Sequence, residues 1–197
     1  MPKVISEHER EQTRNAIIES TKQLICTNNG IKNITVDDIA NSVGIGKGSF
    51  YSYYNSKEEC LYSVIKKWES ELFEQFETIM GGEKSQREKI TTFLRESYLS
   101  ENSLNRYISP TDTEVLLRKL PPEFNEAENE KSNNYIASSM KSFNLDIVQM
   151  EALGALLDCI GFVFSYPAIS KQARDEALDT LIEAIVDYIE NNGGSID

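Results

Sequence analysis

The chain has 197 residues, of which 40% are hydrophobic and 26% charged, and its formal net charge at pH 7 is −12. This length allows one sizeable core, or a small domain beside a larger one. The first ten residues lack the apolar centre of a signal peptide, and no run approaches the ~20 apolar residues that span a bilayer. Three widely spaced cysteines do not make a disulfide framework. We therefore expect a globular, cytoplasmic protein.

The acidic charge is concentrated in the second part of the chain. Residues 1–60 contain seven basic and eight acidic residues, whereas residues 61–197 contain thirteen and twenty-four. Between Ala40 and Asn55 there is one lysine and no carboxylate. Salt screens exposed charges beyond about 8–10 Å. The N-terminal part can therefore approach a polyanion although the whole chain is acidic, with weaker non-specific binding than a basic protein would show.

Apolar residues recur at helical spacing through most of the chain. A first helix is expected over residues 9–28. Two short helices follow over 36–43 and 47–53, and Gly44 between them suits a tight turn because glycine adopts positive φ easily. A long helix is expected from Lys57 to Met80. This succession predicts a helix-turn-helix in front of a long connecting helix.

Further helices are expected in the second part of the chain, over residues 85–101, 113–120, 125–143, 146–165 and 170–191. The segment from Asp146 to Ser165 is apolar on most sides, so it is expected to be buried all round. No segment alternates as a strand does. The sequence predicts an all-α protein with a three-helix helix-turn-helix domain over residues 1–56 and a larger helical domain over residues 57–197.

Helix-capping patterns support these boundaries. Thr35 and Ser56 are each followed three residues later by a carboxylate, which is the pattern of a capping box. Lys57 then lies in the first turn of its helix, where a cation is locally unfavourable. A phosphate bound at that helix N-terminus would remove the conflict. The alternative is that Lys57 is an ordinary solvated lysine.

The motifs around the short helices are specific in combination. They read Thr-x-x-x-Ile-Ala, then Gly-Ile-Gly-x-Gly-x-Phe-Tyr-x-Tyr-Tyr, then Ser-Lys-Glu, within the segment from Arg14 to Trp68. This segment resembles the DNA-binding domain of the tetracycline-repressor-like (TetR) family. The departures from the family pattern are Gly46 for Ser, Tyr54 for Phe and Cys60 for Leu.

The second short helix is expected to keep Phe50 and Tyr54 inside. A cation, a small residue and an aromatic on its outer face suit the major groove of DNA. With the resemblance, this predicts two kinds of DNA contact. Residues approaching bases and backbone, with those beside them, are Lys47, Gly48, Ser49, Tyr51 and Tyr53, and residues holding phosphates are Thr35 and Lys57.

The resemblance also implies a homodimer, an inverted-repeat operator and a small-molecule effector of apolar or amphipathic character that releases the DNA. The expected dimer interface comprises Leu153, Gly154, Leu157, Gly161, Leu178, Leu181 and Ile185. The expected effector pocket comprises Trp68, Phe93, Tyr98, Tyr107, Tyr135, Met140, Phe162 and Tyr166. For both sets the alternative is that the side chains only fill the core of a single chain.

Nothing in the sequence indicates an enzyme, a metal site or a cofactor. His8 is the only histidine, and no catalytic triad, phosphate loop or metal-ligand spacing is present. The cysteines are expected to be small apolar residues, with Cys159 as the first candidate for a redox-active thiol. The alternative function is a helical ligand-binding or protein-interaction module that no longer reads DNA. The sequence does not decide between repression and activation.

Overall fold

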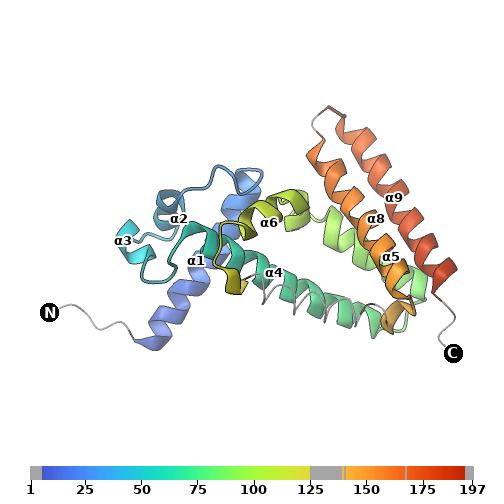
Figure 1. Ribbon diagram of the computed structural model, residues 1–197, viewed down its shortest axis with the longest axis horizontal. Coiled ribbons are helices and arrows are strands. Elements are labelled where there is room, and N and C mark those ends of the chain that lie inside the picture. The colour runs from blue at the N-terminus through green and yellow to red at the C-terminus, as the bar shows by residue number, and fades with distance from the viewer. Residues whose placement is uncertain (1–5, 125–138, 140, 167, 194–197) are drawn as a thin grey trace. The chain divides into compact units, whose positions relative to one another are not determined.

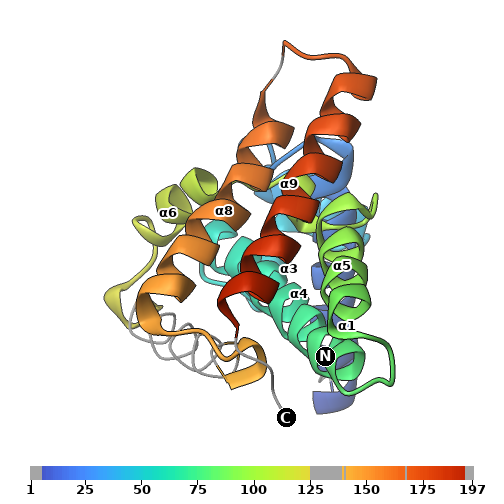
Figure 2. The ribbon, with the colours of Figure 1, turned by 90° about the vertical axis from the view of Figure 1, so that its right-hand side faces the viewer.

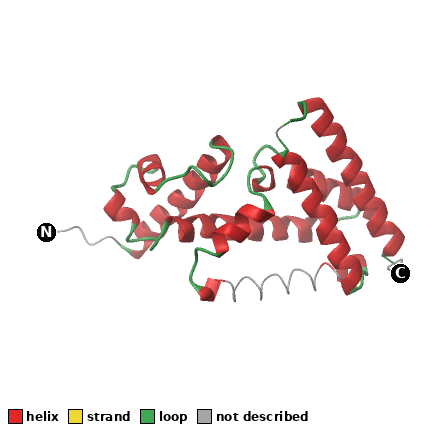
Figure 3. Cartoon of the chain, turned by 45° about the horizontal axis from the view of Figure 1, so that its top comes forward, coloured by secondary structure: helices red, strands yellow, loops and turns green. Residues whose placement is uncertain are grey.

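The computed structural model describes residues 6–124, 139, 141–166 and 168–193. In these ranges every regular element is a helix and none is a strand (Figure 3). The elements, labelled in Figure 1, are α1 (Glu7–Thr27), α2 (Val36–Ser42), α3 (Lys47–Phe50), α4 (Lys57–Met80), α5 (Gln86–Leu94), η1 (Arg95–Leu99), η2 (Leu104–Arg106), α6 (Pro110–Leu117), α8 (Ile147–Ser165) and α9 (Lys171–Asn192). The expected all-α fold is confirmed.

The chain divides into two compact units, Met1–Glu69 and Ser70–Asp197, called here the N-terminal and C-terminal units. The division falls inside α4, so this helix begins in one unit and ends in the other. The sequence prediction places the domain boundary before residue 57 instead, at the start of that helix. A change of element is visible in a sequence, whereas a division within one continuous helix depends on what each half packs against.

In the N-terminal unit, α1, α2, α3 and the beginning of α4 enclose a core of aliphatic and aromatic side chains. Its most deeply buried members are Ile17, Ile25, Ile34, Ile39, Ala40, Phe50, Cys60, Leu61 and Val64. Capping boxes at Ser6 and Thr35 begin α1 and α2, and each such cap contributes on the order of 0.5–2 kcal/mol.

The cap of α4 differs from the predicted capping box. The Ser56 hydroxyl accepts from the Glu59 N–H at 3.1 Å, as expected, but the Glu59 carboxylate accepts from the Asn55 N–H at 3.0 Å. In the predicted capping box the Ser56 N–H would donate to Glu59, whereas here the donor is the Asn55 N–H, one residue earlier.

In the C-terminal unit, α8 and α9 lie side by side and run antiparallel, and α5 packs against α9 (Figure 2). The core between them contains Phe76, Ile90, Leu94, Phe143, Leu145, Leu153, Ile160, Leu178, Ile182, Ile185, Val186 and Ile189. Its aromatic centre is Phe76, which meets Phe93 and Phe143 edge to face with ring centroids 5.1 and 5.7 Å apart. Edge-to-face packing is favourable because the positive ring edge meets the negative ring face.

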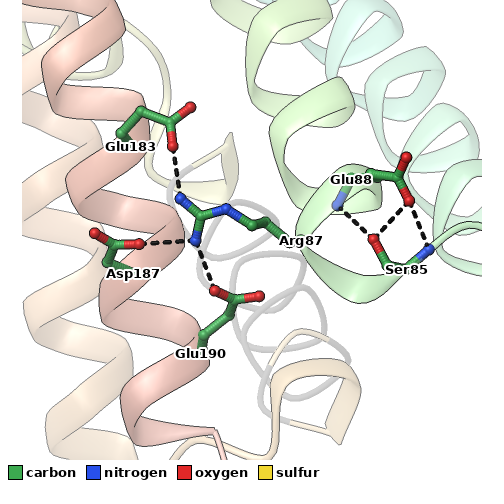
Figure 4. A network of polar contacts seen from close by, with 6 residues as sticks. All are labelled: Ser85, Arg87, Glu88, Glu183, Asp187 and Glu190. Carbon is green, nitrogen blue, oxygen red and sulfur yellow. Dashed lines mark hydrogen bonds and ion pairs between the residues drawn. The ribbon is translucent and has the colours of Figure 1, made fainter.

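An ion-pair cluster joins α5 to α9 on the surface of this unit. Arg87 donates to Glu183, Asp187 and Glu190, which follow one face of α9, at 2.6–2.7 Å (Figure 4). Arg95 reaches Asp179 one turn earlier at 2.9 Å. Part of the acidity of the C-terminal unit is therefore balanced internally.

Two predicted helices end earlier than the sequence suggests. The helix expected over residues 47–53 is helical only to Phe50, because Ser52 and Tyr53 bond back three residues rather than four. The helix expected over 85–101 changes at Arg95 to the five-residue π-helix η1. The helix expected over 125–143 lies largely outside the described residues.

Helix α8 is the largest departure from the expected burial. By length and composition Ile147–Phe164 could cross a membrane, although only 17% of this stretch is buried in the single chain. Val148 and Phe162 are 67% and 56% exposed. The expected burial on all sides is therefore not met within the single chain. One of its apolar faces is turned outward.

Candidate nucleic-acid interface

A tight turn joins α2 to α3. Gly44 adopts φ +70°, which an L side chain reaches only at a cost of roughly 1–2 kcal/mol. Its N–H donates to Asn41 and the N–H of Ile45 donates to Ala40, at 3.1 and 3.0 Å. These bonds close the end of α2 and direct the chain into α3 at Lys47. The predicted turn is present at the predicted glycine.

Short helix α3 separates a buried from an exposed aromatic ring. Phe50 is 0% exposed and anchors the helix in the core, whereas the next residue, Tyr51, is 50% exposed. The two rings meet edge to face at 5.5 Å. Tyr54 is buried beneath the Arg14 guanidinium, 4.9 Å from the ring centroid, and burial raises the pKa of its phenol. Phe50 and Tyr54 are inside, as predicted.

The remaining predicted base-facing residues of α3 are at the surface. Lys47, Gly48 and Ser49 are exposed, and a Cβ placed on Gly48 would have no atom within 4 Å. The packing of the chain therefore does not require a glycine there. The open backbone at Gly48 is consistent with the close approach of another molecule.

Lys47 has a partner inside the chain. Its ammonium group donates to the Asp37 carboxylate on α2 at 2.8 Å, and both side chains are more than half exposed. The hydrogen bond to Asp37 raises the pKa of Lys47. The sequence indicated a cation here but not that a carboxylate ten residues earlier would bind it.

The two residues predicted to hold phosphates also have partners within the chain. The Thr35 hydroxyl donates to Asp38 at 2.7 Å and accepts from the Asp38 N–H at 3.1 Å. The bond from this hydroxyl lowers the pKa of Asp38. Lys57 donates to the Ile34 carbonyl at 2.8 Å. Both residues support the start of α2 in the unbound chain.

Arg10 is a neighbouring cation that the sequence analysis did not select. Its guanidinium donates to the Ser52 carbonyl at 2.8 Å and lies 6.0 Å from the ring centroid of Tyr53. It fixes the turn that follows α3 and adds positive charge beside it. The sequence signal that could have identified Arg10 is the capping box of Ser6 and Glu9, because it begins α1 before Arg10 and so places Arg10 on a helix.

The side chains predicted to line an effector pocket are dispersed in the structure. Phe162 and Tyr166 are more than half exposed, so they do not line an interior. Phe93 packs in the aromatic centre, and the Tyr107 hydroxyl donates to the Glu101 carbonyl at 2.8 Å. Tyr98 is packed against the core, where burial raises the pKa of its phenol.

Three further pocket candidates do not lie in the described part of the C-terminal unit. Trp68 lies in the N-terminal unit. Tyr135 and Met140 are outside the described residues. The resemblance did not show which of the described candidates are buried, because it does not tell which face of each helix is inward.

The predicted dimer residues also fall into two groups. Leu153, Leu178 and Ile185 are at most 3% exposed because they fill the core of the chain's own C-terminal unit. Gly154 is exposed and has open space around its Cα, whereas Gly161 is buried, and a Cβ there would meet Pro110 of α6 at 3.5 Å. Leu157 and Leu181 are half-buried.

The cysteines differ in accessibility. Cys60 is buried against Thr21, and burial raises the pKa of its thiol to about 11. Cys159 is exposed on α8. Within the described ranges, no three His, Cys, Asp or Glu side chains group in a way that could hold a metal ion.

Comparison with known proteins assigns the same segment to a family. Residues 17–64 match the family model described as bacterial regulatory proteins, tetR family. A curated relative, the HTH-type transcriptional repressor KstR2 of Mycolicibacterium smegmatis, is 36% identical over 69 residues, which are 35% of this chain and 34% of that protein. The alignment thus spans about a third of the relative's length.

Solved structures resemble the chain over almost its whole length. A putative transcriptional regulator from Streptomyces coelicolor A3(2) has a TM-score of 0.61 at 20% identity, with 90% of this chain and 98% of that chain covered. RolR in complex with resorcinol has a TM-score of 0.54 at 16% identity, with 98% and 100% covered. At these identities the similarity establishes the fold.

Proposed function

The chain belongs to the tetR family of bacterial regulatory proteins by its N-terminal domain, and from this premise we propose that it is a ligand-responsive transcriptional repressor. It binds an inverted-repeat DNA operator as a homodimer, in the cytoplasm, and a small molecule releases it. The family consists of regulators, in agreement with the expectation that the chain is not an enzyme. No cofactor is part of the proposal.

The outer surface of α3 is the observation that carries the proposal. Phe50 holds this helix in the core while Lys47, Gly48 and Tyr51 are turned to solvent. A short helix held from behind and exposed in front can enter the major groove. Tyr51 supplies an aromatic edge and a hydroxyl, Lys47 supplies a donor for guanine acceptors or phosphate, and Gly48 admits the DNA backbone.

Two substitutions test this surface. Tyr51→Ala and Lys47→Ala should each weaken binding to an operator selected from random duplexes by roughly tenfold or more, because a base contact is worth ~1–3 kcal/mol. Lys57→Ala should weaken all duplexes alike and reduce the salt dependence by about one unit of log–log slope. Fluorescence anisotropy over a salt series measures both effects.

Lys67→Ala is the matched control. Lys67 is a partly exposed lysine of the same unit that pairs with Glu19 at 2.6 Å, outside the helix-turn-helix. Operator binding of Lys67→Ala should equal that of wild type. Wild-type strength in both Tyr51→Ala and Lys47→Ala would refute the placement of α3. A wild-type chain with no salt-sensitive DNA binding would favour the alternative, a helical module that does not read DNA.

The exposed apolar face of α8 supports the proposed dimerisation. Val148, Phe162 and Tyr166 lie on this helix or at its end, with more than half of each side chain exposed. Glu151 and Asp158 are exposed on the same helix, and carboxylates in a bilayer core are costly. We therefore favour a second copy of the chain over a membrane as the partner of this face. Two copies related by a twofold axis match an operator with two symmetric half-sites.

The effector is proposed to bind the C-terminal unit. One feature that supports a polar contact is η1. Turns of π-helix are rare in proteins, and those that occur often lie at functional sites. In this turn the Ser97 hydroxyl is buried with no hydrogen-bond partner in the described structure, and Tyr98 follows it. RolR, which shares the fold, is known in complex with resorcinol. A small apolar or amphipathic molecule with a hydroxyl group is the corresponding ligand class here.

A further inference from the structure

The segment that would read DNA contains unusually few charges. Between Lys32 and Lys57 the only basic residue is Lys47, and the only acidic residues are Asp37 and Asp38. Asp38 is engaged by the cap of α2, where its carboxylate accepts from the Thr35 N–H at 2.8 Å. Asp37 is thus the one carboxylate of the segment that the cap does not use.

Asp37 instead binds Lys47, the cation of α3. Lys47 is the first residue of α3 and Asp37 lies in the first turn of α2, so the 2.8 Å contact joins the two helices of the helix-turn-helix. The side chains are 54% and 59% exposed. Water and counter-ions reach such a pair, so it adds little to folding stability. Its larger effect is on charge, since it neutralises the only cation between Lys32 and Lys57.

We propose that Asp37 lowers the affinity of the chain for DNA by holding Lys47 in the unbound chain, so that an internal carboxylate competes with the DNA for this cation. This inference rests on the proposed function, because it assigns a regulating partner to the same reading surface. Any duplex offers phosphates, and to bind them Lys47 must first leave Asp37, whose own charge is repelled by the DNA. The base-edge acceptors of an operator must displace the same carboxylate before Lys47 can bind them.

The Lys47–Asp37 pair belongs to the unbound chain, so breaking it costs the same free energy whichever duplex binds. Neutralising Asp37 should therefore strengthen binding to arbitrary DNA and to the operator by a similar factor. An exposed pair and one phosphate contact together correspond to an effect of about three- to tenfold.

The experiment measures two affinities of the full-length chain over a salt series. One duplex is selected by the wild-type chain from random sequences, and the other is a scrambled duplex of the same composition. Asp37→Asn should bind both duplexes about three- to tenfold more tightly than wild type. The salt slope on the scrambled duplex should steepen by up to about one unit.

Glu19→Gln is the control matched in charge, since it also removes one carboxylate from a Lys–carboxylate pair of the N-terminal unit. Its affinities should remain at wild-type values. In a Lys47→Ala background, Asp37→Asn should give a smaller gain, because the freed lysine is absent. Thermal unfolding should show the same midpoint for Asp37→Asn and wild type, which excludes a change in folding as the cause.

Two results would overturn the inference while leaving the proposed function intact. These are unchanged affinities of Asp37→Asn for both duplexes, and an equal gain in Glu19→Gln. If wild type binds no duplex in a salt-sensitive way, the proposed function fails and this inference fails with it.

Discussion

The two units of the chain expose opposite kinds of surface. The N-terminal unit keeps its aliphatic residues inside and presents Lys47 and Ser49 from the four-residue helix α3, with Tyr51 directly after it. The C-terminal unit exposes apolar side chains along α8 and balances its acids on α9 through Arg87 and Arg95. The first surface suits a charged, hydrated polymer, and the second suits an apolar partner such as another copy of the chain. The same helical architecture therefore presents two different kinds of surface.

The largest expected effect concerns the apolar face of α8. Phe162→Asp should abolish the dimer, because each subunit would bury an unpaired carboxylate at a cost of roughly 3–5 kcal/mol. The single chain should keep its fold, since Phe162 is 56% exposed there. Sedimentation velocity measures the change in mass, and circular dichroism reports the fold.

Tyr51→Asp is the control for this substitution, because Tyr51 is a similarly exposed aromatic residue of the N-terminal unit. It should leave the dimer intact and remove operator binding. A Phe162→Asp protein that remains dimeric would show that α8 is not the interface. A wild-type chain that is monomeric at micromolar concentration would remove the dimer and the inverted repeat together.

An intermediate effect distinguishes two glycines of the helix-turn-helix. Gly44→Ala should lower the free energy of unfolding by roughly 1–2 kcal/mol, because φ is +70° at this position. Gly48→Ala should not destabilise the fold, since its Cβ would meet no atom within 4 Å, and a gain of up to about 1 kcal/mol is typical of alanine in a helix.

Operator affinity should not follow the order of stability of these two variants. Gly48→Ala should bind the operator more weakly despite an unchanged or higher stability, because the added methyl group would meet the DNA backbone. Urea unfolding and anisotropy measure the two properties on the same samples. Full operator affinity in Gly48→Ala would mean that the DNA does not approach α3 at this residue.

The smallest expected effect is common to both units. Hydrogen bonds from Thr35 lower the pKa of Asp38, and those from Ser85 lower the pKa of Glu88. The folded state therefore favours the ionised carboxylates. This stabilisation is present above their ordinary pKa values of 3.8 and 4.5 and is lost as the pH falls through the lower folded values.

Accordingly, Asp38→Asn and Glu88→Gln should be less stable than wild type at pH 7 but closer to it near pH 3. Urea midpoints at the two pH values test this prediction, and Glu11→Gln, outside both caps, serves as the control. A stability difference that is the same at both pH values would show that these caps do not depend on the ionised carboxylate.

Much of the N-terminal unit could be predicted because its signals are local. The turn at Gly44, the cap at Thr35 and the division between buried Phe50 and exposed Tyr51 depend on residues within a few positions of each other. The length of α3 was overestimated because the continuing apolar spacing does not show that the backbone tightens after Phe50. The partner of Lys47 was missed because it depends on the angle between α2 and α3.

Less of the C-terminal unit could be predicted, since its contacts join distant segments. Phe76, Phe93 and Phe143 meet in one aromatic centre although 67 residues separate the first from the last. Helix α8 is apolar on most sides, so its pattern could not distinguish Leu153, which is buried in the chain, from Phe162, which is exposed. The predicted interface and pocket therefore mixed core residues with surface residues.

By itself, the sequence determined that this chain is helical and where its turn, most of its caps and the short helix α3 lie, because these features depend on backbone preferences and on neighbours a few residues away. Only the tertiary structure decided that Asp37 binds Lys47, that Arg87 joins α5 to α9, and which apolar face of α8 is left uncovered. These contacts depend on how helices cross. A crossing is set by the summed packing of many side chains, which no single stretch of sequence contains.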